Sequence, residues 1–256
     1  GASGRGLLLQ GEVRLPGALI HVGRIDPRHR TGVSAQVLVD DVDDPSGPQL
    51  DGATTHHLSR VLRLRAGEWV CATDGRGAWR RCTFVGGDRL DPGEAHGAEP
   101  ATTDPVAVAF VPVKGDRPEL VVQKLTELGV DRVVVTASER SVVRWDSDRL
   151  DRHLDKLRRV AVEASQQCRR LWLPTVESAP LAELLSAGFA MADMGGGDPG
   201  PELRCAVVGP EGGWSDAERG AATVASVSLG EHVLRAETAA ITAGAVLAGL
   251  RRSRSA

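Results

Sequence analysis

Residues 106–137 read VAVAFVPVKGDRPELVVQKLTELGVDRVVVTA. The stretch begins with a continuous apolar run, which is typical of a strand buried on both faces. Asp116, Pro118 and Glu119 then have the pattern of a helix start. Gly129 supplies the end of that helix. Because RVVVTA follows at once, the stretch predicts a strand, a helix and a second strand of a parallel sheet.

The same alternation continues toward the C-terminus. Residues 149–168 carry Leu and Ala on one stripe and predict a long helix. Ser215 and Glu218 have the spacing of a capping box before a further helix, and residues 236–250 predict a closing helix rich in Ala. Short apolar runs predict the other strands at residues 171–176, 189–194, 205–208 and 227–229. The pattern predicts the α/β class, with a mostly parallel sheet covered by helices on both faces.

The N-terminal part of the chain has a different sequence pattern. Residues 35–100 contain QVLVDDV, GEWVCATDG and AWRRCTFVGG, with hairpin turn chemistry at residues 74–77, and predict a small β domain. Residues 91–105 are rich in Pro, Gly and acid, which is typical of a linker. We therefore expect the second domain to span residues 101–256. Residues 1–34 have no sustained period and predict a flexible leader or extension.

Composition excludes several classes of protein. The chain has 256 residues, 41% of them hydrophobic and 25% charged, with a formal net charge of −3. These values fit an ordinary globular protein and exclude collagen, disorder and a polybasic chain. No apolar run is long enough for a transmembrane helix, so no membrane partner is expected. The four cysteines form no CxxC pair, which argues against a zinc or disulfide scaffold and favours a reducing, cytoplasmic location. We expect no metal.

Two loops follow predicted strands and are candidates for a binding site. Residues 208–214 read VGPEGGW, whose glycines allow close approach of the backbone to a ligand. Residues 229–239 read LGEHVLRAETA and lead from a strand into the last helix. Ligands of such sheets bind at the carboxyl ends of the strands, which favours both loops. Neither matches a phosphate-binding loop, and a simple tight turn is the alternative interpretation of GPEGG.

Several motifs, taken in order, resemble one enzyme family. They are KLTELGV (residues 124–130), ERS (139–141), EASQQCR (163–169), VGPEGG (208–213) and LGEHVLRAETA (229–239). Together they resemble the bacterial uridine N3-methyltransferases of 16S ribosomal RNA, which belong to the SPOUT class, over about residues 36–250. The resemblance implies a PUA-like β-barrel domain followed by a parallel-sheet domain tied in a trefoil knot. It also implies a homodimer and S-adenosylmethionine as methyl donor.

Methyl transfer to the imide nitrogen of uracil needs a group that stabilises the uracil anion and a nearby base, and two residues of the last loop are our candidates for these roles. Arg235 would stabilise the uracil anion, and Glu237 would support it or accept the N3 proton. A carboxylate that complements the helix dipole is an equally good interpretation of Glu237. The residues implied to hold S-adenosylmethionine are Met194, Gly209, Gly213, Leu229, Gly230, Val233 and Leu234.

The implied partner is ribosomal RNA or the small ribosomal subunit. Phosphate contacts would come from a set of basic residues: Arg60, Arg63, Lys114, Arg140, Arg144 and Arg169. Three alternatives stay open at this stage. They are a SPOUT methyltransferase on another RNA target, a non-catalytic RNA-binding protein of ribosome assembly, and a nucleotide-dependent α/β enzyme.

Overall fold

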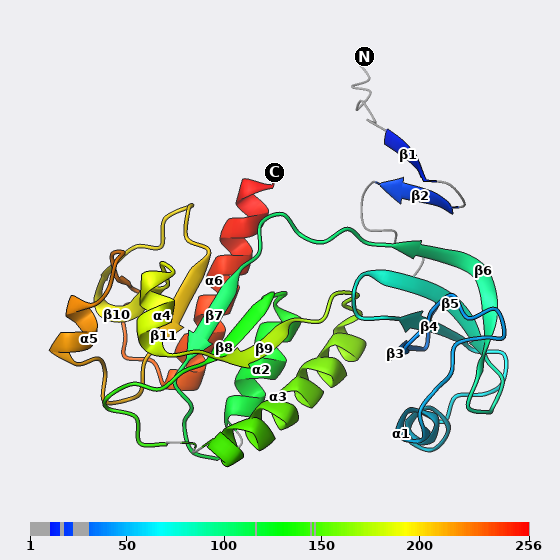
Figure 1. The fold of residues 1–256 in the computed structure, drawn as a ribbon, viewed down its shortest axis with the longest axis horizontal. Helices are drawn as coiled ribbons and strands as arrows, with labels where there is room; N and C mark the ends of the chain where they lie inside the picture. The colour runs from blue at the N-terminus through cyan, green and yellow to red at the C-terminus, as the bar shows by residue number, and fades with distance from the viewer. Residues whose placement is uncertain are drawn as a thin grey trace. The chain divides into compact units, whose positions relative to one another are not determined.

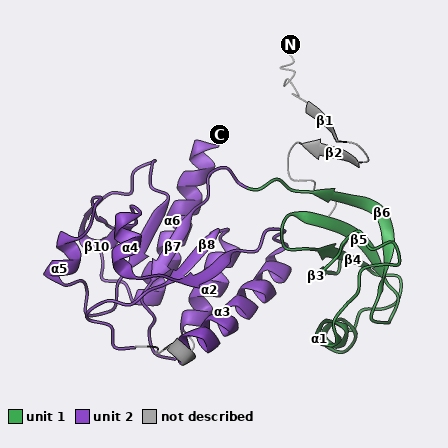
Figure 2. Ribbon diagram, viewed as in Figure 1, with its two compact units in different colours: residues 1–101 green, residues 102–256 purple. Residues whose placement is uncertain are grey.

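The computed structural model divides the chain into two compact units, residues 1–101 and 102–256 (Figure 2). Side chains are described for most of residues 31–255, and the two short segments before them are described as strands only. The described residues are 11–15, 18–22, 31–115, 117–143, 145 and 147–255. Asp116 and Arg144, both singled out in the sequence, lie outside them.

Unit 2 is built on a five-stranded sheet in the order β10-β11-β7-β8-β9. All four pairings are parallel, so the predicted parallel sheet is confirmed. The central strand β7 pairs through Phe110 with Val208 on one side and Val135 on the other. The strands are β7 (Ala107–Phe110), β8 (Arg132–Val135), β9 (Thr175–Ser178), β10 (Ala190–Gly197) and β11 (Cys205–Val208).

Helices cover both faces of this sheet (Figure 1). Val108 and Phe110 of β7 pack into the cluster that contains residues of α2, α3 and α6. Ala109 and Val111 point the other way, into the cluster that contains α4 and Trp214. Burial on both faces explains why the strands read as continuous apolar runs. The helices are α2 (Arg117–Glu127), α3 (Ser147–Cys168), α4 (Leu181–Ser186), α5 (Asp216–Gly220) and α6 (Ala236–Arg254).

A carboxylate fixes α6 against the rest of unit 2. Asp131 precedes β8 and accepts hydrogen bonds from Arg170 at 2.8 Å and from Arg251 of α6 at 2.7 Å. Gly244 of α6 lies so close to Leu125 of α2 that a Cβ would overlap it. These contacts hold the middle and the last turn of α6 against the rest of unit 2.

Unit 1 contains a four-stranded sheet in the order β3-β4-β5-β6, in which only β3 and β4 are parallel. The predicted turn at residues 74–77 joins β4 to β5, and the Asp74 carboxylate accepts from the N–H of Arg76 at 2.7 Å. Cys82 is fully buried in the core of this unit, and burial raises the pKa of its thiol to about 11. The elements are β3 (Ala35–Leu38), α1 (Gly52–His56), the π-helix η2 (His57–Val61), β4 (Trp69–Thr73), β5 (Ala78–Phe84) and β6 (Leu90–Ala98).

The prediction of a linker at residues 91–105 is wrong for its first half, because β6 continues to Ala98 and pairs with β5. β6 is an edge strand, where Pro92 is tolerated because its missing N–H breaks no ladder. Gly93 lies against the backbone of Arg81 with no space for a Cβ. The residues that suggested a linker are thus accommodated by the edge position and by a close backbone contact.

Three other predictions differ from the structure. The strand expected at residues 171–176 begins only at Thr175, because Pro174 has no N–H to donate to a ladder. Residues 227–229 form no strand, and Val227 makes only isolated bridges to Ala192 and Gly197. Within the predicted leader, β1 (Gly11–Leu15) and β2 (Ala18–Val22) pair as an antiparallel hairpin. Each of these strands has five residues, which is too short to show a sustained period.

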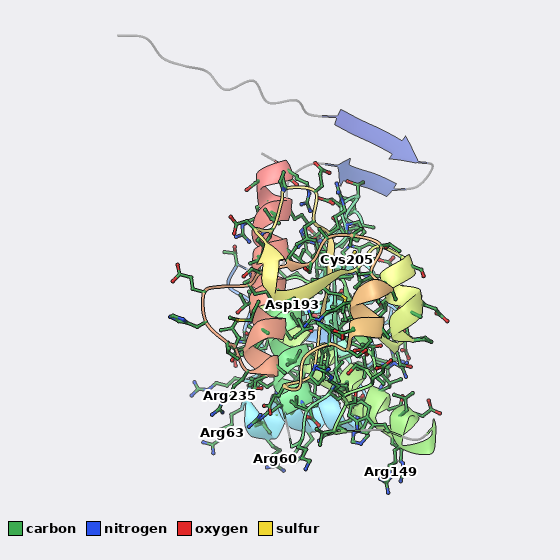
Figure 3. The ribbon with its side chains drawn as sticks, turned by 90° about the vertical axis from the view of Figure 1, so that its left-hand side faces the viewer. Arg60, Arg63, Arg149, Asp193, Cys205 and Arg235 are labelled. Atoms are coloured by element: carbon green, nitrogen blue, oxygen red, sulfur yellow. The ribbon has the colours of Figure 1, made fainter. Side chains whose placement is uncertain are left out.

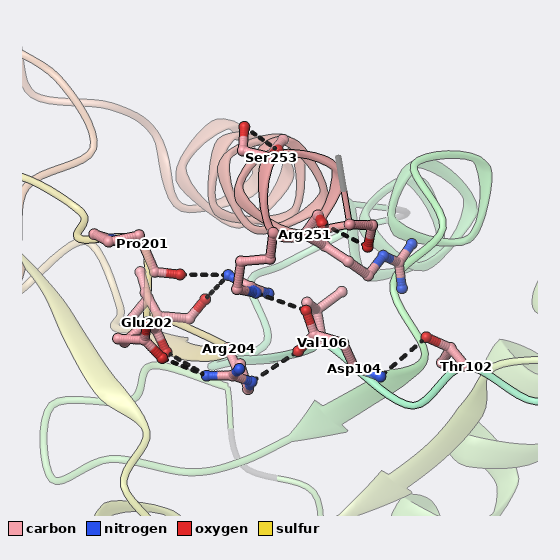
Figure 4. Close-up of polar contacts among 12 residues, drawn as sticks. Thr102, Asp104, Val106, Pro201, Glu202, Arg204, Arg251 and Ser253 are labelled. Carbon is pink, nitrogen blue, oxygen red and sulfur yellow. Dashed lines mark hydrogen bonds and ion pairs between the residues drawn. The ribbon is translucent and has the colours of Figure 1, made fainter. Parts of the chain in front are cut away.

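Asp104 forms ion pairs with two arginines of unit 2 (Figure 4). Its carboxylate accepts from Arg254 Nε at 2.6 Å and from Arg204 Nε at 2.7 Å. These hydrogen bonds lower the pKa of Asp104 below its ordinary value, and the bond from Arg254 has the largest effect. A lowered folded-state pKa stabilises the fold above the unfolded pKa of about 3.9, and this stabilisation is lost as the pH falls through the folded value.

We therefore expect Asp104→Asn to lower the urea midpoint of unfolding at pH 7, and the difference from wild type to shrink as the pH is lowered to about 2. Urea titrations over this pH range measure both quantities. Asp198→Asn, an exposed position of the same unit, is the control. A difference that is the same at every pH would contradict the ionic role of Asp104.

Candidate active site

An open cavity lies at the carboxyl end of β11 and beside residues 192–194 of β10, where the pairing of β10 with β11 ends. Its walls come from three segments: residues 192–194 at β10, residues 208–214 after β11, and residues 228–239, which lead into α6. Ligands of parallel α/β sheets bind at this end of the strands. The cavity therefore occupies the position that the two candidate loops predicted.

The loop after β11 is fixed by a turn and by a buried tryptophan. Gly213 has φ +66°, and its N–H donates to the carbonyl of Pro210 at 2.9 Å. The indole of Trp214 is 3% exposed and lies against Gly209, where a Cβ would come within 2.8 Å of the ring. Trp214 Nε1 donates to the carbonyl of Ala192 at 3.0 Å. The indole thus fastens this loop to β10.

The third wall is positioned by pairing with the end of β10. Ser228 N–H donates to the carbonyl of Gly197 at 2.8 Å, and Gly197 N–H donates to Ser226 at 3.1 Å. Gly196 lies against the backbone of Val227, which leaves no space for a Cβ. Gly230 has φ +150°, a conformation that glycine adopts readily. The loop that follows is thereby directed along the cavity toward α6.

The structure brings together every residue that the resemblance implied for the cofactor. All of them line this single cavity: Met194, Gly209, Gly213, Leu229, Gly230, Val233 and Leu234. Two of the apolar side chains are well exposed, Met194 by 56% and Val233 by 82%. Asp193 and Glu211 add carboxylates to the wall. The cavity combines apolar surface, backbone groups at glycines and negative charge, which suits an organic cation with a flat apolar part.

The two candidate catalytic residues lie beside this wall and not in it. Arg235 stands between the lining residues Leu234 and Ala236, and its exposed side chain points away from the ribbon (Figure 3). It occupies the N-cap position of α6 without making a capping hydrogen bond. Glu237 is in the first turn of α6, where its 12% exposed side chain lies 3.6 Å from Arg117 Nη1.

The predicted RNA-binding residues fall on both units. Arg60 on η2 and Arg63, which has φ +54°, are exposed side chains of unit 1 (Figure 3). In unit 2, Lys114 and Arg140 are exposed, and Arg140 donates to the carbonyl of Gly212 at 3.0 Å. Arg169 is half-buried after the end of α3. The structure therefore connects Arg140 directly to the cavity loop.

Sequence reasoning missed several residues that build the site. Asp193 forms an ion pair with Arg219, and Arg117 Nη1 lies 3.6 Å from Glu211 as well as from Glu237. Their partners are distant in sequence, so no local pattern indicates them. Trp214 did have a signal, since a tryptophan that directly follows a glycine-rich turn can pack back onto it.

Comparison with known proteins identifies the family. A family model described as an RNA methyltransferase domain matches residues 100–248, and one described as an RNA methyltransferase PUA domain matches residues 50–90. The chain belongs to the RNA methyltransferase family. The resemblance inferred from the motifs and the predicted combination of a PUA-like domain with a parallel-sheet domain are confirmed. The knot expected for this RNA methyltransferase remains a prediction.

The relatives have a consistent description. The Ribosomal RNA small subunit methyltransferase E of Mycobacterium bovis is 34% identical over 224 residues, which cover 77% of this chain and 84% of that protein. The protein of the same name from Synechocystis is 31% identical over 236 residues, which cover 80% of this chain and 73% of that protein. The crystal structure of the Neisseria gonorrhoeae protein of that name, bound to S-adenosylmethionine, has a TM-score of 0.68 and 25% identity, and the match covers 84% of this RNA methyltransferase and 97% of that chain.

The described residues of this RNA methyltransferase contain neither a membrane-spanning helix nor a metal-binding cluster. No helix there is long and apolar enough to cross a membrane. Nor does that part of the chain bring together three His, Cys, Asp or Glu side chains that could hold a metal ion.

Proposed function

We propose that this chain transfers a methyl group from S-adenosylmethionine to N3 of a uridine in 16S ribosomal RNA. The observation that carries the proposal is the single cavity formed by two of the motif segments together with residues 192–194 of β10, in a chain of the RNA methyltransferase family. The names of its relatives support ribosomal RNA of the small subunit as the substrate. The choice of uridine N3 rests on the motif resemblance.

The lining of the cavity fits the proposed cofactor. Leu229, Val233 and Leu234 offer apolar surface for an adenine ring, and the glycines offer backbone groups. Asp193 and Glu211 add carboxylates to the wall, which would favour a cationic cofactor, and each also faces an arginine, Arg219 or Arg117. When bound, the cofactor would supply an electrophilic methyl group. The role of the chain is to hold it in one orientation and to bring the base to it.

Arg235 and Glu237 would act on the uracil. The N3 nitrogen carries a proton, and its loss places negative charge on the two flanking carbonyl oxygens. The exposed guanidinium of Arg235, beside the cavity wall, would stabilise this charge. Glu237 would accept the proton, or else hold Arg117 and complement the N-terminus of α6. Its mostly buried carboxylate is compatible with either role.

RNA and a second copy of the chain are the proposed partners. Exposed arginines on unit 1 and Lys114 and Arg140 on unit 2 would contact phosphates. The homodimer follows from the motif resemblance, and sedimentation of the purified chain measures it. With ribosomal RNA as the proposed substrate, we expect the activity in the cytoplasm.

The test uses the full chain, tritiated S-adenosylmethionine and small ribosomal subunits from a strain that lacks this methylation. We expect label in 16S RNA, and mass spectrometry of the digested RNA should place the methyl group on N3 of one uridine. Label in transfer RNA or on a ribose hydroxyl would overturn the proposed substrate. Retention of the chain on the subunit without label would identify it as a binding protein and overturn the proposed activity.

A further inference from the structure

One buried carboxylate joins two loops of unit 2 that are far apart in the sequence. Glu218 is 7% exposed and lies in the first turn of α5. Its Oε2 accepts from the N–H of Ser215 at 2.8 Å, which closes the capping box of this helix. Its Oε1 accepts from the N–H of Glu139 at 2.8 Å, in the loop after β8. The second bond is not needed for capping and connects the two loops.

The loop after β8 is a defined turn with an arginine at its tip. Ser141 N–H donates to the carbonyl of Ser138 at 3.1 Å, and Ser141 Oγ accepts from the N–H of Ser138 at 2.8 Å. Arg140 is exposed on this turn and donates through Nη1 to the carbonyl of Gly212 at 3.0 Å. A guanidinium has further donors, so Arg140 can bind a phosphate while it keeps this bond.

We propose that Glu218 is a positioning residue that holds Arg140 and the glycine-rich loop, residues 209–214, in one arrangement. The inference rests on the proposed function, in which Arg140 contacts RNA and the loop lines the cofactor cavity. Glu218 contacts neither RNA nor cofactor in this account. It fixes the turn that carries Arg140, so an RNA phosphate is bound at a set distance from the methyl donor.

The charge of Glu218 matters for this role. A carboxylate accepts through both oxygens, and hydrogen bonds to an ionised acceptor are stronger than neutral ones. In Glu218→Gln an amide group replaces one oxygen and faces a backbone N–H, so one of the two loops loses its acceptor. Because the glycine-rich loop keeps the Trp214 bond to Ala192, the turn that carries Arg140 is the part expected to move.

Glu139 offers a second way to break the same connection. It is the second residue of the turn that starts at Ser138, a position at which proline is favoured. Glu139→Pro removes the N–H that donates to Glu218 and leaves the capping box intact. Glu139→Ala removes the same side chain but keeps the N–H. The difference between these two variants therefore reports the loss of one hydrogen bond.

The experiment measures methyl transfer to small ribosomal subunits for these variants, each alone and combined with Arg140→Gln. We expect Glu218→Gln and Glu139→Pro to raise the KM for RNA by about 10- to 100-fold, since a misplacement of about 1 Å costs about 100-fold. The Kd for S-adenosylmethionine, measured by calorimetry, should change much less. Arg140→Gln should raise the KM for RNA by a smaller factor in Glu218→Gln or Glu139→Pro than in wild type, because the arginine is already misplaced in those variants.

Different results separate this inference from the proposed function. Penalties that simply add, in folded variants of an active enzyme, would overturn the positioning role of Glu218. So would equal KM values for Glu139→Pro and Glu139→Ala. A wild-type chain that transfers no methyl group would overturn the proposed function, and the inference with it. If Glu218→Gln does not fold, the two Glu139 variants decide the matter alone.

Discussion

Arg235→Ala should lower kcat for methyl transfer by about 100- to 1000-fold, the usual cost of removing one donor aimed at a developing anion. In the proposed reaction, negative charge develops on the uracil oxygens as the N3 proton leaves, and the side chain of Arg235 makes no capping bond that would compete for it. Transfer of tritium at saturating RNA and S-adenosylmethionine measures kcat. The Kd for S-adenosylmethionine should stay near its wild-type value, because the guanidinium does not line the cavity.

Two controls make this result specific. Arg252→Ala removes an exposed arginine from the last turn of the same helix and should leave kcat unchanged. Arg235→Lys keeps the charge and should restore part of the rate. Full activity of Arg235→Ala in a folded protein would remove the residue from the mechanism.

Glu237→Gln distinguishes the two roles open to that carboxylate. If Glu237 accepts the N3 proton, kcat should fall by about 100-fold or more, since general bases contribute about 100- to 10,000-fold. If it only complements the helix dipole, the loss should appear in stability, at about 0.3–1 kcal/mol, with kcat preserved. Measuring kcat and the thermal midpoint of one variant separates the two.

Trp214→Ala should lower the free energy of unfolding by about 3–5 kcal/mol, the range for deleting a large buried aromatic side chain. The change empties the space beside Gly209 and leaves the carbonyl of Ala192 without its indole donor. Because the indole fastens the glycine-rich loop to β10, binding of S-adenosylmethionine should weaken as well. Urea unfolding followed by circular dichroism, together with calorimetry, measures the two effects.

Trp69→Ala is the matched control for this deletion. Trp69 is 41% exposed in unit 1, with the guanidinium of Arg81 4.2 Å from its ring centroid. Losing that contact should cost about 1 kcal/mol and leave cofactor binding unchanged. Similar losses of stability for the two variants would contradict the fastening role of Trp214.

Strong local patterns predicted much of the fold. β7 forms within the apolar run, and α2 ends at Glu127, just before Gly129, as predicted. The capping box at Ser215 and Glu218 also forms as expected. Predictions were wrong where a partner strand decided the conformation. β6 carries Pro and Gly yet pairs with β5 at a sheet edge, and Val227, which the sequence placed in a strand, makes only isolated bridges to Ala192 and Gly197.

The residues proposed to hold the cofactor could be selected before the structure, because two loops at strand ends and the family-like order of the motifs both indicated them. All seven of these residues line one cavity in the structure. The remainder of the site could not be selected. The approach of Arg117 to Glu211 and Glu237, and the bond from Glu139 to Glu218, join residues with no common local pattern.

The amino-acid order by itself determined the helices and most strands of unit 2, and the motifs indicated the family, because periodicity, caps and glycine stops act over a few neighbouring residues. Tertiary structure alone decided which loops became neighbours. The order β10-β11-β7-β8-β9 brings β10 and the end of β11 beside the start of α6, and only then do Trp214 and Glu218 reach Ala192 and Glu139, their partners distant in sequence. A hydrogen bond requires its two groups within about 3 Å, a condition that sequence spacing does not encode.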